Sequence, residues 1–439
     1  MSTAIRGSVW ALVYLLVALG PLFFMLVGDA PPSRGWLVDL SVGLGFLGLA
    51  MMGLQFAITA RFNAVDASYG LDVVLRFHRQ IAFVATGFIL AHPVLLFIDD
   101  PATLRLLNVF EAGWQARFGV LSIVLVLAVV IQSVWRQQLR LPYEVWRLTH
   151  GLLSLGIVAT ALVHIELVGY YVSGPWRRGL WIAMSLAILG LLVYSRVIKP
   201  WRSLRRPWRV RSVQALPGDT WHLWLEADGH DGVSFAPGQF AWVTIDRSTF
   251  SLREHPFSFS SSAEDPHQVR VTIKELGDFT SQIGEVAEGT RAYLDGPYGA
   301  FSFERGQAEG FVFLAGGIGV TPMLSMLHTM RERGDHRPVH LFYANATWED
   351  ASVREELAEL SAAMELEVVH VLEDPPDDWE GPAGLITPAL LAERLPDRAS
   401  RFSYFVCGPD PMMSAVEDLL GERGVRPDQQ HYERFDFIE

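Results

Sequence analysis

Cysteine is almost absent from this sequence, with Cys407 the single example among 439 residues. One thiol excludes an internal disulfide framework and also an iron–sulfur cluster held by thiolates. Any redox chemistry must therefore reside in bound cofactors. Positive charge is scarce as well: 35 lysine and arginine residues face 48 aspartate and glutamate residues, for a formal net charge of −13. This balance gives no indication of nucleic-acid binding.

Charged residues are also unevenly distributed along the chain. Apolar residues crowd into the part before Trp201, whereas most acidic residues follow Gly218. A hydrophobic content of 50% and a mean hydropathy of +0.25 are too high for an ordinary soluble protein. Part of the chain is therefore expected in a lipid bilayer. No convincing small-residue cleavage site follows the first apolar run, which favours a retained first span over a signal peptide.

Six apolar stretches are long enough to span a bilayer. They are residues 9–27, 37–60, 77–98, 118–135, 146–168 and 180–198. Short loops rich in arginine and lysine stay in the cytoplasm. On one side of the six stretches the flanking basic residues are Arg61, Arg76, Arg79, Arg136, Arg140, Arg147, Lys199, Arg202, Arg205, Arg206 and Arg209, and on the other side the loops carry Asp29, Asp99, Asp100 and Glu111. Both termini are therefore predicted to be cytoplasmic.

Two histidine pairs with the same internal spacing lie in the third and fifth apolar stretches. His78 and His92 are 14 residues apart. The same separation divides His150 from His164. At about 1.5 Å per residue, the members of each pair lie near one helix face and about 21 Å apart. If two such helices lie side by side, His78 faces His150 near the cytoplasmic leaflet, and His92 faces His164 near the outer leaflet. Opposed imidazoles at membrane depth are suitable axial ligands for haem iron, so we predict two stacked haems.

The histidines have other interpretations. They could be core or interfacial residues, or members of a proton relay. Metal binding without a porphyrin is less favoured, because the pairs lie too far apart to share an ion and two ligands alone make a poor zinc site. The matched depth and spacing of the two pairs favour haem.

The pattern changes after a hinge at residues 201–207. Short alternating runs punctuated by glycine and proline, such as residues 240–245 and 269–273, predict an antiparallel β-barrel. From near Gly310, a strand-like segment leads through glycines into a helix, and two further strands follow. This order is expected of a parallel α/β domain.

Three motifs in the barrel segment together suit a flavin. They are His255-Pro256-Phe257-Ser258, Gly277-Asp278-Phe279-Thr280 and Gly296-Pro297-Tyr298-Gly299. Phe257 can lie against the ring system and Ser258 can hydrogen-bond the ring or the ribityl chain, while the later turn can offer N–H groups and hydroxyls to the diphosphate. Each motif alone is compatible with ordinary turn chemistry. Their order and spacing together predict an FAD site.

Two motifs in the last segment suit a nicotinamide nucleotide. The glycine-rich run at residues 315–322 follows a strand and opens a helix, so a pyrophosphate can approach the helix N-terminus. Cys407-Gly408-Pro409 ends a later strand, and the ends of parallel strands converge on one crevice. Cys407 could lie against the nicotinamide there, or be a small buried hydrophobe without reactivity.

The segment Glu433-Arg434-Phe435 near the end of the sequence could place an aromatic ring over the flavin face where nicotinamide must enter. Phe435 could equally anchor the tail. The expected fold is thus a membrane all-α six-helix haem bundle at residues 1–203, an antiparallel β-barrel FAD domain at residues 204–306, and an α/β nucleotide-binding domain at residues 307–439.

Together these motifs resemble the NADPH oxidase and ferric reductase superfamily, whose six-span domain carries two bis-histidine haems and whose cytoplasmic half is similar to ferredoxin–NADP reductase. The resemblance implies a bacterial inner-membrane protein with FAD, two b-type haems and NADPH or NADH as cofactors. Catalytic roles are implied for Phe435 and Cys407. The residues expected to bind FAD or the nucleotide are His255, Pro256, Phe257, Ser258, Lys274, Gly277, Phe279, Thr280, Gly316, Gly317, Gly319, Thr321, Pro322, Cys407, Gly408, Pro409, Glu433 and Phe435.

The sequence departs from the pattern of this superfamily in two places. Residues 436–439 extend beyond Phe435, so the stacking role could shift to Phe437. A basic residue usually follows the second strand of the nucleotide domain in NADPH-selective members, where it balances the 2′-phosphate. Here residues 344–347 are followed by Glu349 and Asp350, which leaves NADH, or either nucleotide, open.

The expected activity is transfer of electrons from cytoplasmic NAD(P)H through FAD and two haems to oxygen on the outer face, which yields superoxide. Ferric chelates are the alternative acceptor, and a third possibility is electron delivery to a periplasmic or quinone-linked partner. No calcium-binding loop or proline-rich ligand segment is evident, so no regulatory subunit is expected. Four arginines expected on the outer side could neutralise haem propionates, attract superoxide or be solvated loop charges: Arg105, Arg117, Arg177 and Arg178.

Overall fold

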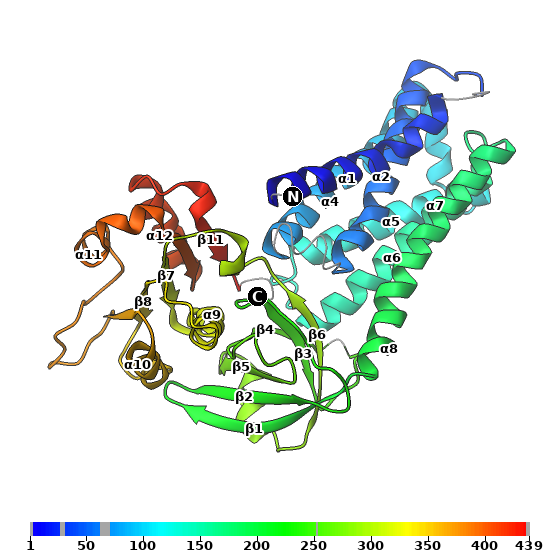
Figure 1. Cartoon of the computed structure of the whole chain (residues 1–439). Helices are drawn as coiled ribbons and strands as arrows, with labels where there is room; N and C mark the ends of the chain where they lie inside the picture. Colours follow the sequence, from blue (N-terminus) through cyan, green and yellow to red (C-terminus); the bar gives the residue numbers. More distant parts are fainter. Residues whose placement is uncertain (1–2, 27–30, 62–70, 252, 436–439) are drawn as a thin grey trace. The chain divides into compact units, whose positions relative to one another are not determined.

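A computed structural model describes residues 3–26, 31–61, 71–251 and 253–435 of the chain (Figure 1). Its internal contacts separate a helical unit, residues 1–69 and 73–200, from a unit built on two β-sheets, residues 70–72 and 201–439. Each unit has its own buried core.

The helical unit consists of long apolar helices. They are α1 (Thr3–Leu26), α2 (Trp36–Thr59), α4 (Leu71–Asp99), α5 (Trp114–Val134), α6 (Tyr143–Val168) and α7 (Pro175–Val193), with a π-helical turn (Tyr194–Ile198) joining α7 to α8 (Lys199–Leu204). Within the described residues, five helical segments are long and apolar enough to cross a membrane, and a shorter apolar segment, Gly7–Phe23, lies in α1. The chain is therefore a multi-pass membrane protein.

The helices extend further than the apolar stretches in the sequence. α4 begins at Leu71 rather than at residue 77, and the helical segment that starts at Pro175 continues to Leu204. Charged and polar residues at the ends of a span lie at the membrane interface, where they end the apolar pattern without ending the backbone hydrogen bonding.

Glycines on α2 allow its neighbours to approach closely. A Cβ atom on Gly48 would lie 2.7 Å from the Ile89 side chain of α4, and one on Gly53 would lie 2.7 Å from the Ile188 side chain of α7. Lipid tails are as apolar as leucine, so helix association in a membrane depends on such close packing of small residues. Phe46 and Trp181 add an edge-to-face contact between α2 and α7 with ring centroids 5.7 Å apart.

The first sheet of the second unit is antiparallel. Its strands are β1 (Trp208–Leu216), β2 (Thr220–Ala227), β3 (Phe240–Ile245), β4 (His255–Ser258), β5 (Gln268–Lys274) and β6 (Arg291–Tyr298), in the spatial order β4-β3-β6-β1-β2-β5. A bridge between Phe259 and Val271 joins the two edge strands and closes the sheet. Phe259 is fully buried against Phe235, with ring centroids 4.1 Å apart, at the centre of this barrel.

The second sheet is parallel. Its strands are β7 (Phe311–Gly316), β8 (Val339–Asn345), β9 (Leu366–Leu372), β10 (Ser403–Cys407) and β11 (Gln430–Glu433), in the order β11-β10-β7-β8-β9. Helices α9 (Thr321–Arg333) and α10 (Arg354–Ala363) cover one face, and α11 (Pro388–Arg394) and α12 (Asp410–Glu422) cover the other (Figure 1).

Strand β7 shows how the sequence builds this sandwich of layers. Phe311 and Phe313 pack on the face with α9 and α10, whereas Val312 and Leu314 pack on the face with α11 and α12. A strand buried on both faces reads as a continuous apolar run, as it does here. The strand order reverses between β7 and β10, so the carboxyl ends of these two strands flank the crevice where ligands of such sheets bind.

Candidate functional site

The histidines of the helical unit form the two pairs that the spacing predicts. The ring centroids of His78 on α4 and His150 on α6 lie 6.3 Å apart. Those of His92 and His164 on the same two helices lie 6.4 Å apart. A metal between two imidazoles needs about 2.0–2.1 Å to each nitrogen, taking zinc–histidine bonds as a guide. The remainder of the distance between the two ring centroids is the distance from each ring centre to its own nitrogen. Each pair therefore leaves room for one metal ion.

Hydrogen bonds at Nδ1 orient three of the four imidazoles. Nδ1 of His164 lies 2.7 Å from the carbonyl oxygen of Gln115, and Nδ1 of His92 lies 3.0 Å from that of Ser41. A carbonyl can only accept, so both Nδ1 atoms carry the proton and Nε2 keeps the lone pair that a metal requires. Nδ1 of His150 lies 3.1 Å from the Ser133 hydroxyl. Such partners at the second ring nitrogen are typical of metal-ligating histidines.

Two glycines make room for the second pair of rings. A Cβ atom on Gly45 would lie 3.2 Å from the His92 ring, and one on Gly119 would lie 3.0 Å from Nδ1 of His164. The sequence pattern did not single out Gly45 or Gly119, because a glycine in an apolar span is unremarkable until its neighbour is known. Elsewhere in the described part of the chain, no group of three or more histidine, cysteine or acidic residues could hold a metal ion.

The arginines expected on the outer side differ in their surroundings. Arg177 on α7 is buried, with 2% of its surface exposed, which excludes the solvated-charge interpretation for that residue. Arg178 pairs with Glu166, and Arg117 donates to the carbonyls of Ala112 and Phe110. Arg105 is exposed in a 3₁₀ turn.

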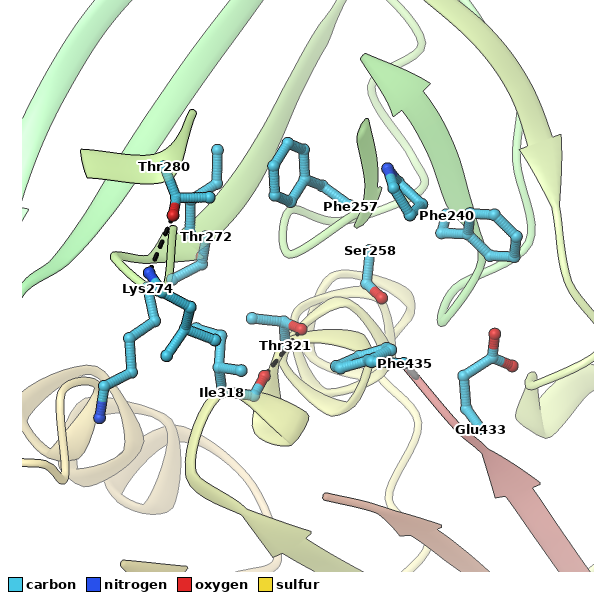
Figure 2. A pocket seen from close by; sticks show the side chains of 13 residues that line it. Phe240, Phe257, Ser258, Thr272, Lys274, Thr280, Ile318, Thr321, Glu433 and Phe435 are labelled. Atoms are coloured by element: carbon cyan, nitrogen blue, oxygen red, sulfur yellow. Dashed lines mark hydrogen bonds between the residues drawn. The ribbon is translucent and has the colours of Figure 1, made fainter. Parts of the chain in front are cut away.

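The second unit contains a pocket between the barrel and the parallel sheet (Figure 2). It encloses about 710 Å³, including the part open to solvent, and its lining residues are Phe240, Pro256, Phe257, Ser258, Thr272, Ile273, Lys274, Leu276, Thr280, Ile318, Thr321, Glu433 and Phe435. Figure 2 shows Phe257 and Ser258 above Thr321 and Phe435, with Glu433 beside Phe435.

The pocket brings together eight of the residues predicted to bind FAD or the nucleotide. These are Pro256, Phe257, Ser258, Lys274, Thr280, Thr321, Glu433 and Phe435. Phe240, Thr272, Ile273, Leu276 and Ile318 also line it and were not predicted, since nothing in their local sequence distinguishes them from core or loop residues. Phe240 pairs with Ser258 across β3 and β4, a register that only the folded sheet reveals.

Contacts made by the predicted FAD residues His255, Phe279 and Thr280 support the wall of the pocket. The ring of His255 stacks on Phe279, with centroids 3.9 Å apart and planes inclined by 14°. The hydroxyl oxygen of Thr280 accepts hydrogen bonds from the backbone N–H groups of Leu276 and Gly277, at 2.8 and 3.0 Å. Thr280 thereby holds the turn in one conformation before any ligand binds.

Lys274 has a partner within the protein. Its ammonium nitrogen lies 2.8 Å from a carboxylate oxygen of Asp350, which also accepts a hydrogen bond from the Thr347 hydroxyl. The hydrogen bond from Lys274 is the main cause that lowers the pKa of Asp350. This pair joins the end of β5 to the loop after β8, the loop expected near the nucleotide ribose.

The glycine-rich loop meets the Cys407 segment as expected. A Cβ atom on Gly319 would lie 2.3 Å from the carbonyl oxygen of Cys407, and one on Gly316 would lie 2.8 Å from Pro409. Gly317 has a positive φ of 52°. The loop leads through a 3₁₀ turn into α9, which starts with Thr321 and Pro322. A helix N-terminus at the end of a parallel strand is suited to binding a diphosphate.

The residues at the end of β10 and those after β11 differ in their access to the pocket. Cys407 is fully buried and is not among the residues that line the pocket, while Gly408 lies against Gly316. Glu433 ends β11 with 8% of its surface exposed, and Phe435 lines the pocket with 37% exposed. Phe437 falls outside the described residues. The stacking role of Phe435 and the catalytic role of Cys407 stay predictions.

Three protein families match successive parts of the chain. The family described as "Ferric reductase like transmembrane component" matches residues 44–161, "FAD-binding domain" matches residues 206–302, and "Oxidoreductase NAD-binding domain" matches residues 313–418. The chain belongs to the NADPH oxidase and ferric reductase superfamily. Like other members, it joins a ferric reductase-like membrane domain to a dehydrogenase half similar to ferredoxin–NADP reductase.

Individual proteins are similar to about half of this chain or less. The reductase component of propane 2-monooxygenase from Rhodococcus jostii is 31% identical over 241 residues, which are 52% of this chain and 62% of that protein. NADH–cytochrome b5 reductase 1 from Arabidopsis thaliana is 31% identical over 180 residues, 40% of this chain and 64% of that protein. The chain thus spans less than two thirds of these relatives. A solved FAD/NAD-binding domain of nitric oxide dioxygenase from Vibrio cholerae, 23% identical, covers 52% of this chain and 98% of its own, with a TM-score of 0.47.

The turn held by Thr280 leads to a prediction about FAD binding. Replacing Thr280 with valine keeps the shape of the side chain but removes the acceptor for two backbone N–H groups. We expect FAD to bind about thirtyfold more weakly, since two such hydrogen bonds are lost and each contributes about 1 kcal/mol. The measurement is flavin retained per polypeptide during dilution and desalting. Thr280→Ser keeps the hydroxyl and should retain FAD; equal retention by the valine variant would contradict the assignment.

Proposed function

We propose that this protein is a transmembrane NAD(P)H oxidase. It passes electrons from NAD(P)H in the cytoplasm, through FAD and then two b-type haems, to molecular oxygen on the outer face, with superoxide as the product. The observation that carries the proposal is the matched geometry of the two histidine pairs, at 6.3 and 6.4 Å between ring centroids, on the same two helices.

The helical unit would hold both haems. His78 and His150 would ligate the inner one, and His92 and His164 the outer one. Bound haem supplies an iron that takes up and gives back one electron at a time. The protein contributes the orientation of the rings, because the carbonyls of Ser41 and Gln115 hold the protonated nitrogens away from the gap between the helices.

The pocket in the second unit would hold the isoalloxazine ring of FAD. Bound FAD accepts a hydride as an electron pair and can release the electrons singly, which adapts a two-electron donor to one-electron carriers. Phe257 and Ser258 would contact the ring, and Phe435 would cover the face that nicotinamide must reach. Pro409 would set the depth of the nicotinamide, with the fully buried Cys407 packed beneath the glycine-rich loop at Gly319. Hydride transfer needs no protein acid or base, so these residues bind and orient.

The proposed function includes the orientation of the protein in the membrane and its preference between NADH and NADPH. We infer a bacterial inner-membrane protein with both termini and the dehydrogenase half in the cytoplasm, an orientation that the arginine-rich loops favour. NADH is favoured as the donor, because Glu349 and Asp350 follow β8, and Lys274, one of the cations near that loop, is already paired with Asp350. No regulatory subunit is needed.

A ferric chelate is the second candidate for the terminal acceptor. The match of residues 44–161 to the family of ferric reductase-like transmembrane components favours it. Among the described residues, no cluster of histidine, cysteine or acidic side chains is suited to capture a metal ion, which favours oxygen.

Superoxide production can be measured directly. The purified protein with FAD and haem should reduce cytochrome c on addition of NADH in air, and superoxide dismutase should abolish nearly all of that reduction. Dismutase-insensitive activity that rises with ferric citrate would instead support the ferric reductase. Cofactors that become reduced and stay reduced in air would indicate a missing partner protein.

The pairing of the histidines predicts the effect of losing one ligand. In His164→Ala the haem content should fall from two to one per polypeptide, because a single imidazole binds haem weakly, while NADH should still bleach the flavin within about twofold of the original rate. Pyridine haemochrome assays and stopped-flow absorbance measure these two quantities. The control is His336→Ala, an exposed histidine in the second unit. Two haems and full oxygen consumption in His164→Ala would contradict the pairing.

The position of Phe435 at the pocket predicts an effect on nucleotide choice. Replacing it with alanine uncovers the flavin face, so the ratio of kcat/KM for NADH and NADPH should change by about threefold or more, as expected when one apolar contact is lost. Haem content should not change. The control is Phe250→Ala, an exposed ring outside the pocket lining. Unchanged kinetics in Phe435→Ala, with an effect at Phe437 instead, would transfer the role to Phe437.

A further inference from the structure

A buried carboxylate joins the barrel to the nucleotide-binding domain. Glu356 on α10 lies with one oxygen 2.5 Å from the Arg270 guanidinium of β5 and 2.5 Å from Nε2 of His328 on α9. Its other oxygen lies 3.4 Å from Nε2 of His222 on β2. These side chains are between 6% and 16% exposed. The four residues are called here the Glu356 cluster. Two come from the barrel strands β2 and β5, and two come from helices α9 and α10 of the nucleotide-binding domain. The boundary between the barrel and that domain is called the seam below.

Hydrogen bonds connect the cluster to one wall of the flavin pocket. Nδ1 of His222 lies 2.9 Å from the hydroxyl of Thr272, a residue that lines the pocket. Thr272 donates to the Ser260 hydroxyl at 2.7 Å, and Arg270 donates to both the hydroxyl and the carbonyl of Ser260. Ser260 stands two residues after Ser258, which lines the pocket as well.

The cluster is also connected to the opposite wall. His328 lies on α9, the helix that starts at Thr321, where the glycine-rich loop ends and the pocket lining continues. A helix is a rigid rod over this length, so a side chain that holds α9 at His328 also holds its N-terminus. The Glu356 cluster thus ties the wall expected beside FAD to the helix expected beside the nucleotide.

The charge on Glu356 is retained in this buried position. Burial alone would raise the pKa of Glu356, but the hydrogen bonds of His222 and His328 and the charge of Arg270 outweigh that effect and hold the pKa well below its usual range. A buried ionic group of this kind adds little net stability compared with apolar packing, and fixing one arrangement of two parts is its best-supported use.

We propose that Glu356 is a positioning residue that sets the distance between the nicotinamide and the flavin. This inference rests on the proposed function, in which the nucleotide loses a hydride and is oxidised while FAD gains that hydride and is reduced. Hydride transfer requires close approach of the two rings, and a displacement of about 1 Å can cost about a hundredfold in rate. The cluster holds the two walls at the separation that the transfer needs.

Exposed ion pairs on the same seam provide a comparison. Arg333 on α9 lies 2.6 Å from Glu264 of the barrel and 2.6 Å from Glu304, and these side chains are 38–43% exposed. Solvent-exposed pairs of this type contribute little, because water competes for both charges. Arg333→Gln therefore removes a charge from the seam without disturbing the buried cluster.

The test uses the full-length protein with its cofactors in detergent or nanodiscs. Anaerobic stopped-flow bleaching of the flavin over a range of NADH concentrations gives a limiting rate and a dissociation constant. In Glu356→Gln we expect the limiting rate to fall about ten- to a hundredfold, with the dissociation constant changed by less than about threefold. Arg333→Gln should stay within about twofold of the original protein in both quantities.

A double variant separates positioning from simple stabilisation. Arg270→Met combined with Glu356→Gln removes both buried charges, so its thermal midpoint should return toward that of the original protein. The limiting rate should stay low, because the carboxylate of Glu356 that contacts His222 beside Thr272 and His328 on α9 is still missing. Hydrogen exchange of β5 and α10 without NADH should be faster in Glu356→Gln. If that variant is recovered without FAD, His328→Gln takes its place and should slow the limiting rate about fivefold.

Three results would overturn the proposal or its basis. A limiting rate in Glu356→Gln equal to that of the original protein would exclude a positioning role. Recovery of the rate together with the thermal midpoint in the double variant would reduce the cluster to a structural one. If neither NADH nor NADPH bleaches the flavin of the original protein, the proposed function itself fails, and hydrogen exchange then reports only whether the cluster holds the seam.

Discussion

Two imidazole pairs have nearly the same separation at two depths of one helix bundle, and this matched geometry constrains the membrane half of the protein. α4 and α6 hold ring centroids 6.3 Å apart at His78 and His150 and 6.4 Å apart one level away. Two helices can meet both conditions only if they stay nearly parallel and do not rotate against each other. The carbonyls that orient the rings belong to Ser41 on α2 and Gln115 on α5, and Gly45 on α2 leaves space for one ring, so these two helices support the same geometry.

The dehydrogenase half meets a related requirement by other means. Its pocket takes one wall from an antiparallel barrel and the other from the end of a parallel sheet, and neither wall alone encloses a site. Apolar packing would join two such parts without specifying their angle or distance. The seam instead contains directional polar contacts, among them the buried carboxylate of Glu356 and the pair of Lys274 with Asp350. Each demands a particular alignment, which suits a site where two rings must meet.

Local patterns in the sequence predicted much of the architecture. Six apolar stretches became helices, and the alternating runs near residues 240–245 and 269–273 became strands of a closed antiparallel sheet. The glycine-rich loop met the Cys407 segment at the switch point of the parallel sheet. These features depend on neighbours close in sequence, or on rules of chain topology that hold for all sheets of this kind. The ends of the helices were less predictable, because interfacial polar residues end the apolar pattern before the helix ends.

The sequence by itself determined the elements and their order, and it supplied the residues proposed for haem, flavin and nucleotide, because helix periodicity, strand alternation and glycine-rich turns are local properties. Only the tertiary structure decided which side chains meet across elements. It paired Lys274 with a carboxylate 76 positions away, buried Cys407 outside the pocket lining, and placed Glu356 between two histidines and Arg270. Such contacts depend on strand register and helix packing, and a single sequence carries no local signal for either.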